Sequence, residues 1–153
     1  MKKMNLDKIQ IWYRNCITTQ ISQISQTLIM ENFYLKDETY KIIGLCMEVH
    51  KILGRGHSEN TYGDALEYEF KINNIPYERE KKYTIEYKDI LLPRYYFSDF
   101  TVYDEIILEL KAIESLSSSE IKQTLNYLAA SKNKIGLLIN FGEDSLKYKR
   151  IIL

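Results

Sequence analysis

Cysteine and histidine are scarce in this chain of 153 residues, which contains two of each. Cys16 and Cys46 match no metal-binding spacing, so the sequence predicts neither a zinc site nor a disulfide framework. We interpret both as reduced thiols of a cytoplasmic protein. His50 and His57 have no serine or cysteine partner at an identifiable triad spacing. We therefore interpret His50 as a helix residue and His57 as a loop residue.

Long apolar runs and an excess of charge are also missing. No window approaches the ~18 consecutive apolar residues of a membrane span, and no apolar stretch follows Lys2 and Lys3 to make a signal peptide. Lysine plus arginine and aspartate plus glutamate number 21 each, so the net charge is zero. Proteins that bind nucleic acid without sequence preference usually have a basic excess. Any phosphate-binding surface of this chain is therefore local.

Glycine and proline do not occur at all in residues 1–36, which sets this region apart from the rest. A helical spacing relates four of its apolar residues and predicts a weak amphipathic helix; they are Ile17, Ile21, Ile24 and Leu28. We expect residues 1–29 to be a loosely attached extension, or the product of an upstream start. Residues 30–153 are expected to form one compact domain.

The remaining chain passes from helical to strand patterns and back. Apolar residues recur at helical spacing up to Asn73, interrupted by Gly54-Arg55-Gly56, since glycine supplies the positive φ of helix ends. Ser117 and Glu120 have the spacing of a capping box, which marks the start of a further helix. The predicted elements are helices 37–53 and 58–73, strands 77–87, 90–102 and 106–113, helix 118–131, and strand 134–140.

The predicted strand 106–113 begins with the apolar run Ile106-Ile107-Leu108, which indicates burial on both faces, and 134–140 is a final apolar strand. The connection between them passes through a helix, and a crossover of this kind joins parallel strands. The sequence therefore predicts an α/β fold in which helices flank a mixed central sheet.

Two carboxylates and one lysine lie on neighbouring predicted strands. Side chains alternate along a strand, so Glu109 and Lys111 project from one face. If the second and third strands pair through a turn near Asp104, then Asp99 lies close to Glu109. Two carboxylates on one face suit Mg²⁺ or Mn²⁺, and the lysine offers a charge for a phosphate or an attacking water. The alternative is a surface salt bridge on an exposed sheet face.

Three further residues are candidates for the same site. Gln123 and Tyr127 lie four positions apart, on one face of the helix that follows the third strand. They either flank the site or are an exposed glutamine beside a tyrosine at the edge of the core. Glu59 opens the second helix, where the helix dipole favours an acid. Its functional interpretation is a third carboxylate for the metal ion.

Several short motifs agree with the pattern of one family. They are Gly56-His57-Ser58-Glu59-Asn60-Thr61-Tyr62, Ser98-Asp99-Phe100, Glu109-Leu110-Lys111, Gln123 with Tyr127, and Ile135-Gly136-Leu137-Leu138-Ile139-Asn140-Phe141-Gly142. With them the chain resembles the PD-(D/E)XK nuclease superfamily and, within it, the small bacterial GxxExxY proteins. The glutamine and tyrosine match the Q-x-x-x-Y of its helicase-associated exonuclease branch. The resemblance covers residues 33–153.

The resemblance implies a restriction-endonuclease-like αβββαβ core and assigns a role to each candidate. Asp99 and Glu109 are expected to ligate Mg²⁺ or Mn²⁺, Lys111 to be catalytic, and Glu59 to be a supporting acid on the first conserved helix. Two departures stand out. Ser98 replaces the proline that often precedes the aspartate, and residues 1–29 have no counterpart in the family.

Two classes of function remain after these observations. The first is a metal-dependent nuclease that hydrolyses phosphodiester bonds of DNA or RNA, with DNA expected, and that acts as a homodimer or with a partner protein because it is small and neutral. The second is a catalytically silent nucleic-acid-binding or assembly protein on the same fold. A nucleotide-binding enzyme is not supported, because Gly54-Arg55-Gly56 is too short for a phosphate loop and follows a helix.

Overall fold

A computed structural model describes residues 17–23, 25–26 and 34–153. The chain divides into two units, residues 1–36 and 37–153. In the first unit the described residues up to position 26 are helical, and Ile17 and Ile21 are exposed. Cys16, Ile24 and Leu28 lie outside the described residues. The assignment of residues 1–29 to a separate extension stays a prediction.

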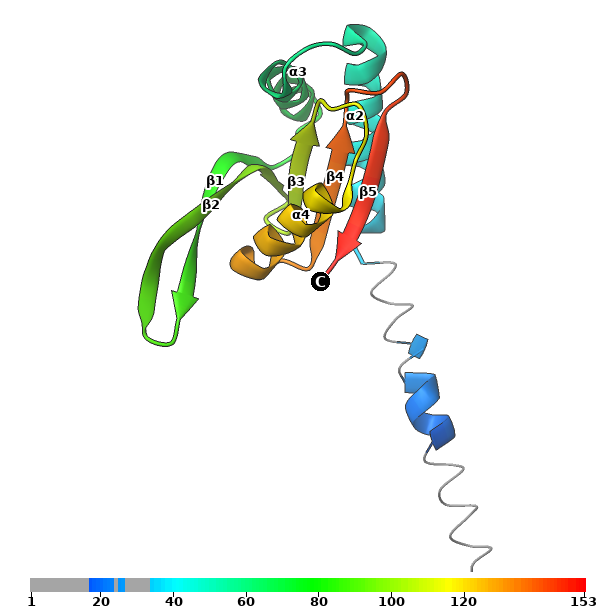
Figure 1. Ribbon diagram of the computed structural model, residues 1–153. Helices are drawn as coiled ribbons and strands as arrows, with labels where there is room; N and C mark the ends of the chain where they lie inside the picture. The colour runs from blue at the N-terminus through cyan, green and yellow to red at the C-terminus, as the bar shows by residue number, and fades with distance from the viewer. Residues whose placement is uncertain (1–16, 24, 27–33) are drawn as a thin grey trace, which may run out of the picture. The chain divides into compact units, whose positions relative to one another are not determined.

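The second unit is an α/β structure, as the sequence predicts. Its five-stranded sheet has the order β1-β2-β3-β4-β5, in which only β3 and β4 are parallel (Figure 1). Helix α4 covers one face of the sheet, and α2 and α3 lie on the other. The elements are α2 Lys36–Leu53, α3 Glu59–Ile72, β1 Tyr77–Tyr87, β2 Ile90–Val102, β3 Ile106–Lys111, α4 Ser118–Ser131, β4 Ile135–Asn140 and β5 Lys147–Ile152. None of the helices within the described ranges is long and apolar enough to cross a membrane.

Strands β3 and β4 form the centre of the core, and both the predicted burial of β3 and the predicted parallel pairing of β4 are confirmed. All six residues of β4 and five of the six in β3 are buried, and the two strands pair in parallel. The predicted capping box also forms at the start of α4. The backbone N–H of Ser117 donates to Glu120 at 2.7 Å, and the Ser117 hydroxyl accepts from the N–H of Ser119 at 3.1 Å.

Two details differ from the sequence prediction. Strand β3 ends at Lys111, two residues earlier than predicted. The reason is that the buried Asn140 side chain hydrogen-bonds both the N–H and the carbonyl of Ile113. These hydrogen bonds, at 3.0 and 2.9 Å, replace the ladder that would continue the strand. Strand β5 was not predicted. Its three basic residues and mostly exposed side chains hide the strand pattern, and pairing with β4 overrides this weak local preference.

Strands β1 and β2 extend beyond the rest of the sheet as a two-stranded hairpin (Figure 1). Strand β3 pairs with β2 only from Phe100 to Val102, so residues 82–97 pair with each other alone. We call residues 82–97 the arm. Its base is fixed by Tyr83 and Tyr96, which pack against the cluster beneath α4. A two-stranded hairpin is marginally stable by itself, so this packing holds the arm on the domain.

The loop after β4 offers a test of the packing around Asn140. A Cβ added at Gly142 would overlap the main chain of Ile113 and Ala112, whereas a Cβ at Gly44 in α2 meets nothing within 4 Å. We expect Gly142→Ala to lower the midpoint of thermal unfolding clearly. Gly44→Ala is the matched control and is expected to leave the midpoint unchanged or raise it, since alanine favours a helix by up to ~1 kcal/mol. Equal midpoints in circular dichroism melts contradict this account.

Candidate functional site

Asp99 and Glu109 face each other across β2 and β3. The antiparallel register pairs Phe100 with Leu108, so the next position on each strand is one of the two acids. The N–H of Asp99 donates to Glu109 Oε1 at 3.4 Å, and the N–H of Leu110 donates to Asp99 Oδ2 at 2.6 Å. Each carboxylate thus contacts the main chain of the opposite strand. The structure brings this predicted pair together.

The surroundings of the pair disfavour two negative charges. Glu109 is only 3% exposed, and burial together with the charge of Asp99 raises the pKa of Glu109 to about 9. Burial also raises the pKa of Asp99, although the hydrogen bond from Leu110 and the charge of Lys111 oppose the change. No salt bridge within the described ranges includes either acid. A proton or a bound cation is therefore needed to relieve their repulsion.

Lys111 lies within electrostatic reach of both acids. It follows Glu109 by two positions on β3, so the two side chains leave the strand on the same face. The positive charge of Lys111 lowers the pKa of Asp99 and of Glu109. Lys111 is half-buried at the last position of the strand. The predicted grouping of two carboxylates with one ammonium is thus present in the structure.

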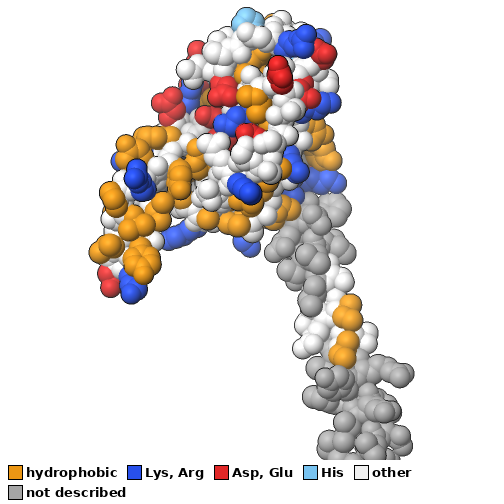
Figure 2. Space-filling view, viewed as in Figure 1, with side chains coloured by type: hydrophobic (Ala, Val, Ile, Leu, Met, Phe, Trp, Pro, Cys, Tyr) orange, Lys and Arg blue, Asp and Glu red, His pale blue; other side chains and the backbone are white. Residues whose placement is uncertain are grey.

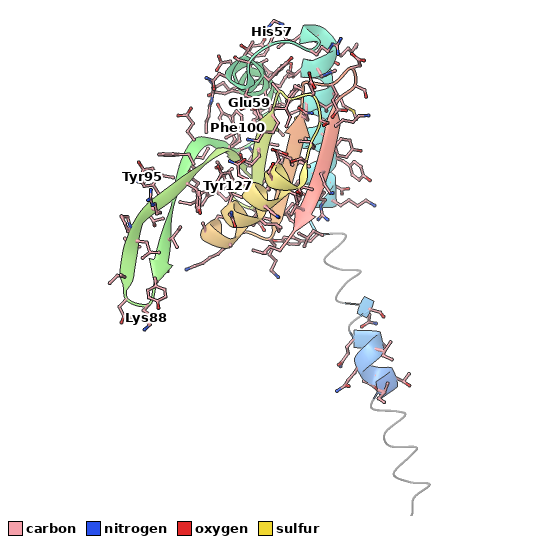
Figure 3. The ribbon with its side chains drawn as sticks, viewed as in Figure 1. His57, Glu59, Lys88, Tyr95, Phe100 and Tyr127 are labelled. Atoms are coloured by element: carbon pink, nitrogen blue, oxygen red, sulfur yellow. The ribbon has the colours of Figure 1, made fainter. Side chains whose placement is uncertain are left out.

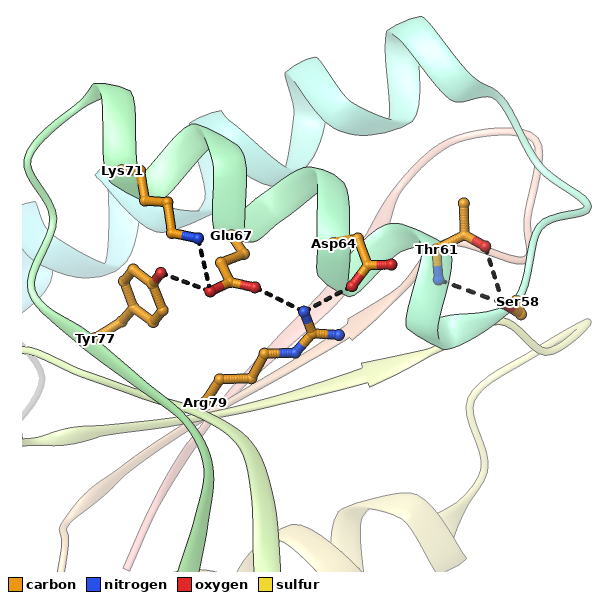
Figure 4. Close-up of polar contacts among 7 residues, drawn as sticks. All are labelled: Ser58, Thr61, Asp64, Glu67, Lys71, Tyr77 and Arg79. Atoms are coloured by element: carbon orange, nitrogen blue, oxygen red, sulfur yellow. Dashed lines mark hydrogen bonds and ion pairs between the residues drawn. The ribbon is translucent and has the colours of Figure 1, made fainter.

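Glu59 approaches the same region from α3. Ser58 caps this helix by accepting the N–H of Thr61 at 3.3 Å (Figure 4), which places Glu59 in the first turn. Glu59 Oε1 accepts the N–H of Ala112, just past β3, at 3.1 Å. Its charge raises the pKa of Asp99 and Glu109, and a small pocket has both Glu59 and Asp99 in its wall. Glu59 is exposed and lies at the rim of the site.

Gln123 and Tyr127 lie together on α4. The Gln123 amide donates to the Tyr127 hydroxyl at 2.9 Å, and the Tyr127 ring packs edge-on against Tyr96 at 5.2 Å. Burial raises the pKa of Tyr127, and the charge of Glu109 raises it further. Tyr127 therefore belongs to the core cluster and also lies near the acid pair.

The Gly56–Tyr62 motif has a structural part and a part that faces the site. Gly56 has φ +104, which favours glycine. The buried Tyr62 ring stacks on Phe141 at 4.4 Å, and its hydroxyl donates to the carbonyl of Gly54 at 2.8 Å. These contacts hold the loop before α3. They leave Glu59 as the member of the motif that reaches the end of β3.

The two histidines have the positions that the sequence predicts. His50 lies in α2, where its Nε2 is 3.0 Å from the carbonyl oxygen of Glu143 and its ring stacks on Phe141. His57 lies in the loop before α3. The main-chain N–H of His57 donates to the Tyr62 hydroxyl at 3.2 Å, and the His57 ring packs edge-on against the Tyr62 ring.

Arg79 is a neighbour of the site that the sequence did not reveal. Its Nη1 donates to Asp64 and to Glu67, each at 2.7 Å (Figure 4). Its guanidinium carbon lies 5.6 Å from the centre of the Phe100 ring. Its charge lowers the pKa of Asp99. Strand β1 alternates charges of both signs, so no spacing distinguished this arginine from its neighbours. Asn140 was also missed as a site residue, although it fixes Ile113.

The acids fit a hard divalent cation only in part. Within the described ranges, no three His, Cys, Asp or Glu side chains gather closely enough to hold a metal ion. Glu59, Asp99 and Glu109 are therefore not one three-carboxylate group in this structure. Mg²⁺ commonly binds through one or two carboxylates and keeps several waters. The pair Asp99 and Glu109 fits that mode, with oxygen donors and a charge repulsion that a cation relieves.

Comparisons with known proteins identify one superfamily. The sequence profile of the PD-(D/E)XK nuclease superfamily matches residues 36–151. A solved structure described as "Crystal structure of SSO0001" is 20% identical, with a TM-score of 0.49. The alignment covers 61% of this chain and 48% of the other, so this chain spans about half the length of that protein. No curated protein matches the chain significantly.

The raised pKa of Glu109 predicts a stability that falls with pH. A carboxyl group whose folded pKa lies near 9, above the usual 4.5, contributes most at low pH, and its contribution is lost as the pH rises through about 9. Glu109→Gln stays neutral. We therefore expect the variant to melt at a higher temperature than the wild type at about pH 8 in chelator-treated buffer, and the difference to shrink towards about pH 5.

The control for this experiment is Glu114→Gln, since Glu114 is exposed just beyond β3. Its offset from the wild type should be nearly constant over the same pH range. A constant offset for Glu109→Gln as well means that Glu109 does not take up its proton on folding.

Proposed function

This chain belongs to the PD-(D/E)XK nuclease superfamily, and on that basis we propose that it is a metal-dependent nuclease that hydrolyses phosphodiester bonds, with DNA as substrate. The observation that supports the proposal most is the reciprocal contact of Asp99 and Glu109 beside Lys111. We further propose that it is one of the GxxExxY proteins, because the motif from Gly56 to Tyr62 delivers Glu59 to the end of β3.

Each candidate residue has a chemical role in this proposal. Asp99 and Glu109 hold Mg²⁺ or Mn²⁺. Such an ion lowers the pKa of a bound water and offsets charge that builds on the phosphate. Lys111 provides a fixed positive charge for the phosphate or the attacking water.

The remaining candidates support the same reaction from the neighbouring helices. Glu59 steadies the end of β3 through Ala112 and adds negative charge at the rim. Gln123 and Tyr127 present an amide and a hydroxyl from α4, which suits contact with a phosphate oxygen or a water.

A catalytically silent binding or assembly protein is the second candidate. The observation in its favour is that the described residues gather no group of three metal-binding side chains. In that case the acid pair binds a proton on Glu109 in place of a metal ion. The neutral net charge fits either function when a partner protein or a second copy supplies part of the affinity for nucleic acid.

Metal uptake separates the two candidates. We expect calorimetry at low salt to show Mn²⁺ binding to the wild type and none to Asp99→Asn. Because Glu109 must release its proton to act as a ligand, the affinity should rise with pH from about 6.5 to about 8.5, by up to tenfold per pH unit. Absence of Mn²⁺ uptake at every pH contradicts the nuclease proposal.

Cleavage of linear and single-stranded DNA tests the activity itself. With Mn²⁺ present, Asp99→Asn and Lys111→Ala are expected to lose about 100-fold or more in rate, the usual effect of removing a group that acts in the transition state. Lys149→Ala is the control, since Lys149 is exposed on β5. Equal rates in all four proteins indicate a contaminating nuclease and contradict the proposal.

A further inference from the structure

The arm exposes large apolar side chains for which the proposed hydrolysis gives no role. Figure 2 shows them gathered along the arm with cationic side chains among them. They are Tyr87, Ile90, Leu91, Tyr95 and Phe97, each about half exposed or more. Contiguous apolar surface of this kind marks an interaction site in soluble domains.

Two of these rings lie on β2 within a few residues of the acid pair. Side chains alternate along the arm, so Tyr95 and Phe97 project from one face of β2, and Tyr96 projects from the other and packs on Tyr127. The regular alternation ends before Asp99, since the hydroxyls of Ser98 and Thr101 meet at 3.1 Å although the two residues are three positions apart. At about 3.3 Å per residue, Phe97 lies about 7 Å and Tyr95 about 13 Å along the strand from Asp99. A polymer held at Asp99 meets these rings within its next few units.

Cations accompany the rings of the arm. Lys82 is the cross-strand partner of Phe97, and its Nζ lies 4.1 Å from the centre of the Tyr95 ring. The rings of Tyr95 and Phe97 are 5.4 Å apart and meet edge-on. Near the tip, Lys88 lies over the ring of Tyr87 at 5.5 Å. Figure 3 shows Lys88 at the tip, Tyr95 further along the arm and Phe100 at its base.

We propose that Tyr95, Phe97 and Lys82 form a stacking platform for unpaired nucleotides that adjoin the phosphodiester at Asp99. Exposed rings beside cations are what proteins use to bind single strands, because every base offers a flat face to stack on. The bases of a duplex are already stacked, so their faces are not available to these rings. The inference rests on the proposed nuclease function, since that function places the strand at Asp99. It names single-stranded nucleic acid as the preferred substrate.

Binding of a fluorescein-labelled thymidine oligonucleotide of about 16 nucleotides tests the platform. Anisotropy measured in chelator and low salt reports binding without cleavage, so the result does not depend on the nuclease activity. Tyr95→Ala and Phe97→Ala are each expected to weaken binding at least about fivefold, the lower limit for loss of one stacked base. Tyr95→Phe retains the ring and should bind as the wild type does. Phe97→Leu retains the apolar bulk and should bind as weakly as Phe97→Ala.

Tyr68→Ala is the control, since Tyr68 is an exposed tyrosine on α3, away from the arm. It should bind the oligonucleotide as the wild type does, and the arm variants should not change the affinity for a duplex of the same length. Unchanged affinity of Tyr95→Ala and Phe97→Ala for the single strand overturns the proposal. So does a wild-type dimer in sedimentation that these variants convert to monomer while the oligonucleotide affinity stays the same, because the arm is then a contact between copies.

The cleavage assay separates this proposal from the one on which it rests. If the arm variants bind the single strand weakly and Asp99→Asn still cleaves as the wild type does, the platform stands and the nuclease assignment fails. If Asp99→Asn is inactive and the arm variants bind normally, the nuclease assignment stands and the platform fails.

Discussion

The burial of Glu109 against Asp99 is the constraint around which this domain is organised. Glu109 is buried and Asp99 is half-buried beside it, so two negative charges there repel each other, and the described residues provide no salt bridge to either. The arrangement persists for two reasons. The strands around it are packed on both faces. In addition, a main-chain N–H of β2 donates to Glu109 and one of β3 donates to Asp99. The domain thus uses the stability of its core to maintain a pair of acids that by itself disfavours folding.

The loop segments beside the acid pair are fixed by hydrogen bonds and ring contacts. Asn140 at the end of β4 hydrogen-bonds to Ile113 and to Gly142, which fixes the turn that follows Lys111. The Phe141 ring stacks on the rings of His50 and Tyr62, so the same turn is packed against α2 and α3. The start of α3 and the ends of β3 and β4 therefore pack as one unit. The Gly56–Tyr62 motif, which the sequence associates with the candidate site, is thus also a packing motif.

Local patterns in the sequence were sufficient for much of this structure. Buried strands, the capping box and the pairing of β2 with β3 follow from periodicity and turn residues, so the proximity of Asp99 to Glu109 was predictable. Features that depend on distant partners were not. Strand β5 forms by pairing with the edge of β4. Asn140 hydrogen-bonds Ile113, which lies 27 positions away. Arg79 is held by Asp64 and Glu67 on α3. The hydrogen bond from the N–H of Ala112 to Glu59 also joins residues far apart in the sequence, so it was not predictable either.

The narrow join between the arm and the sheet has a consequence for how such a protein changes over evolutionary time. Strand β3 pairs with β2 only from Phe100 to Val102, and Tyr83 and Tyr96 pack the base of the arm against the core, whereas Tyr87, Ile90 and Leu91 at its tip are exposed. Substitutions and insertions near the tip are thus largely free of the selection that preserves folding. Sequence changes at the tip would therefore alter what the arm contacts without altering the packing of the core.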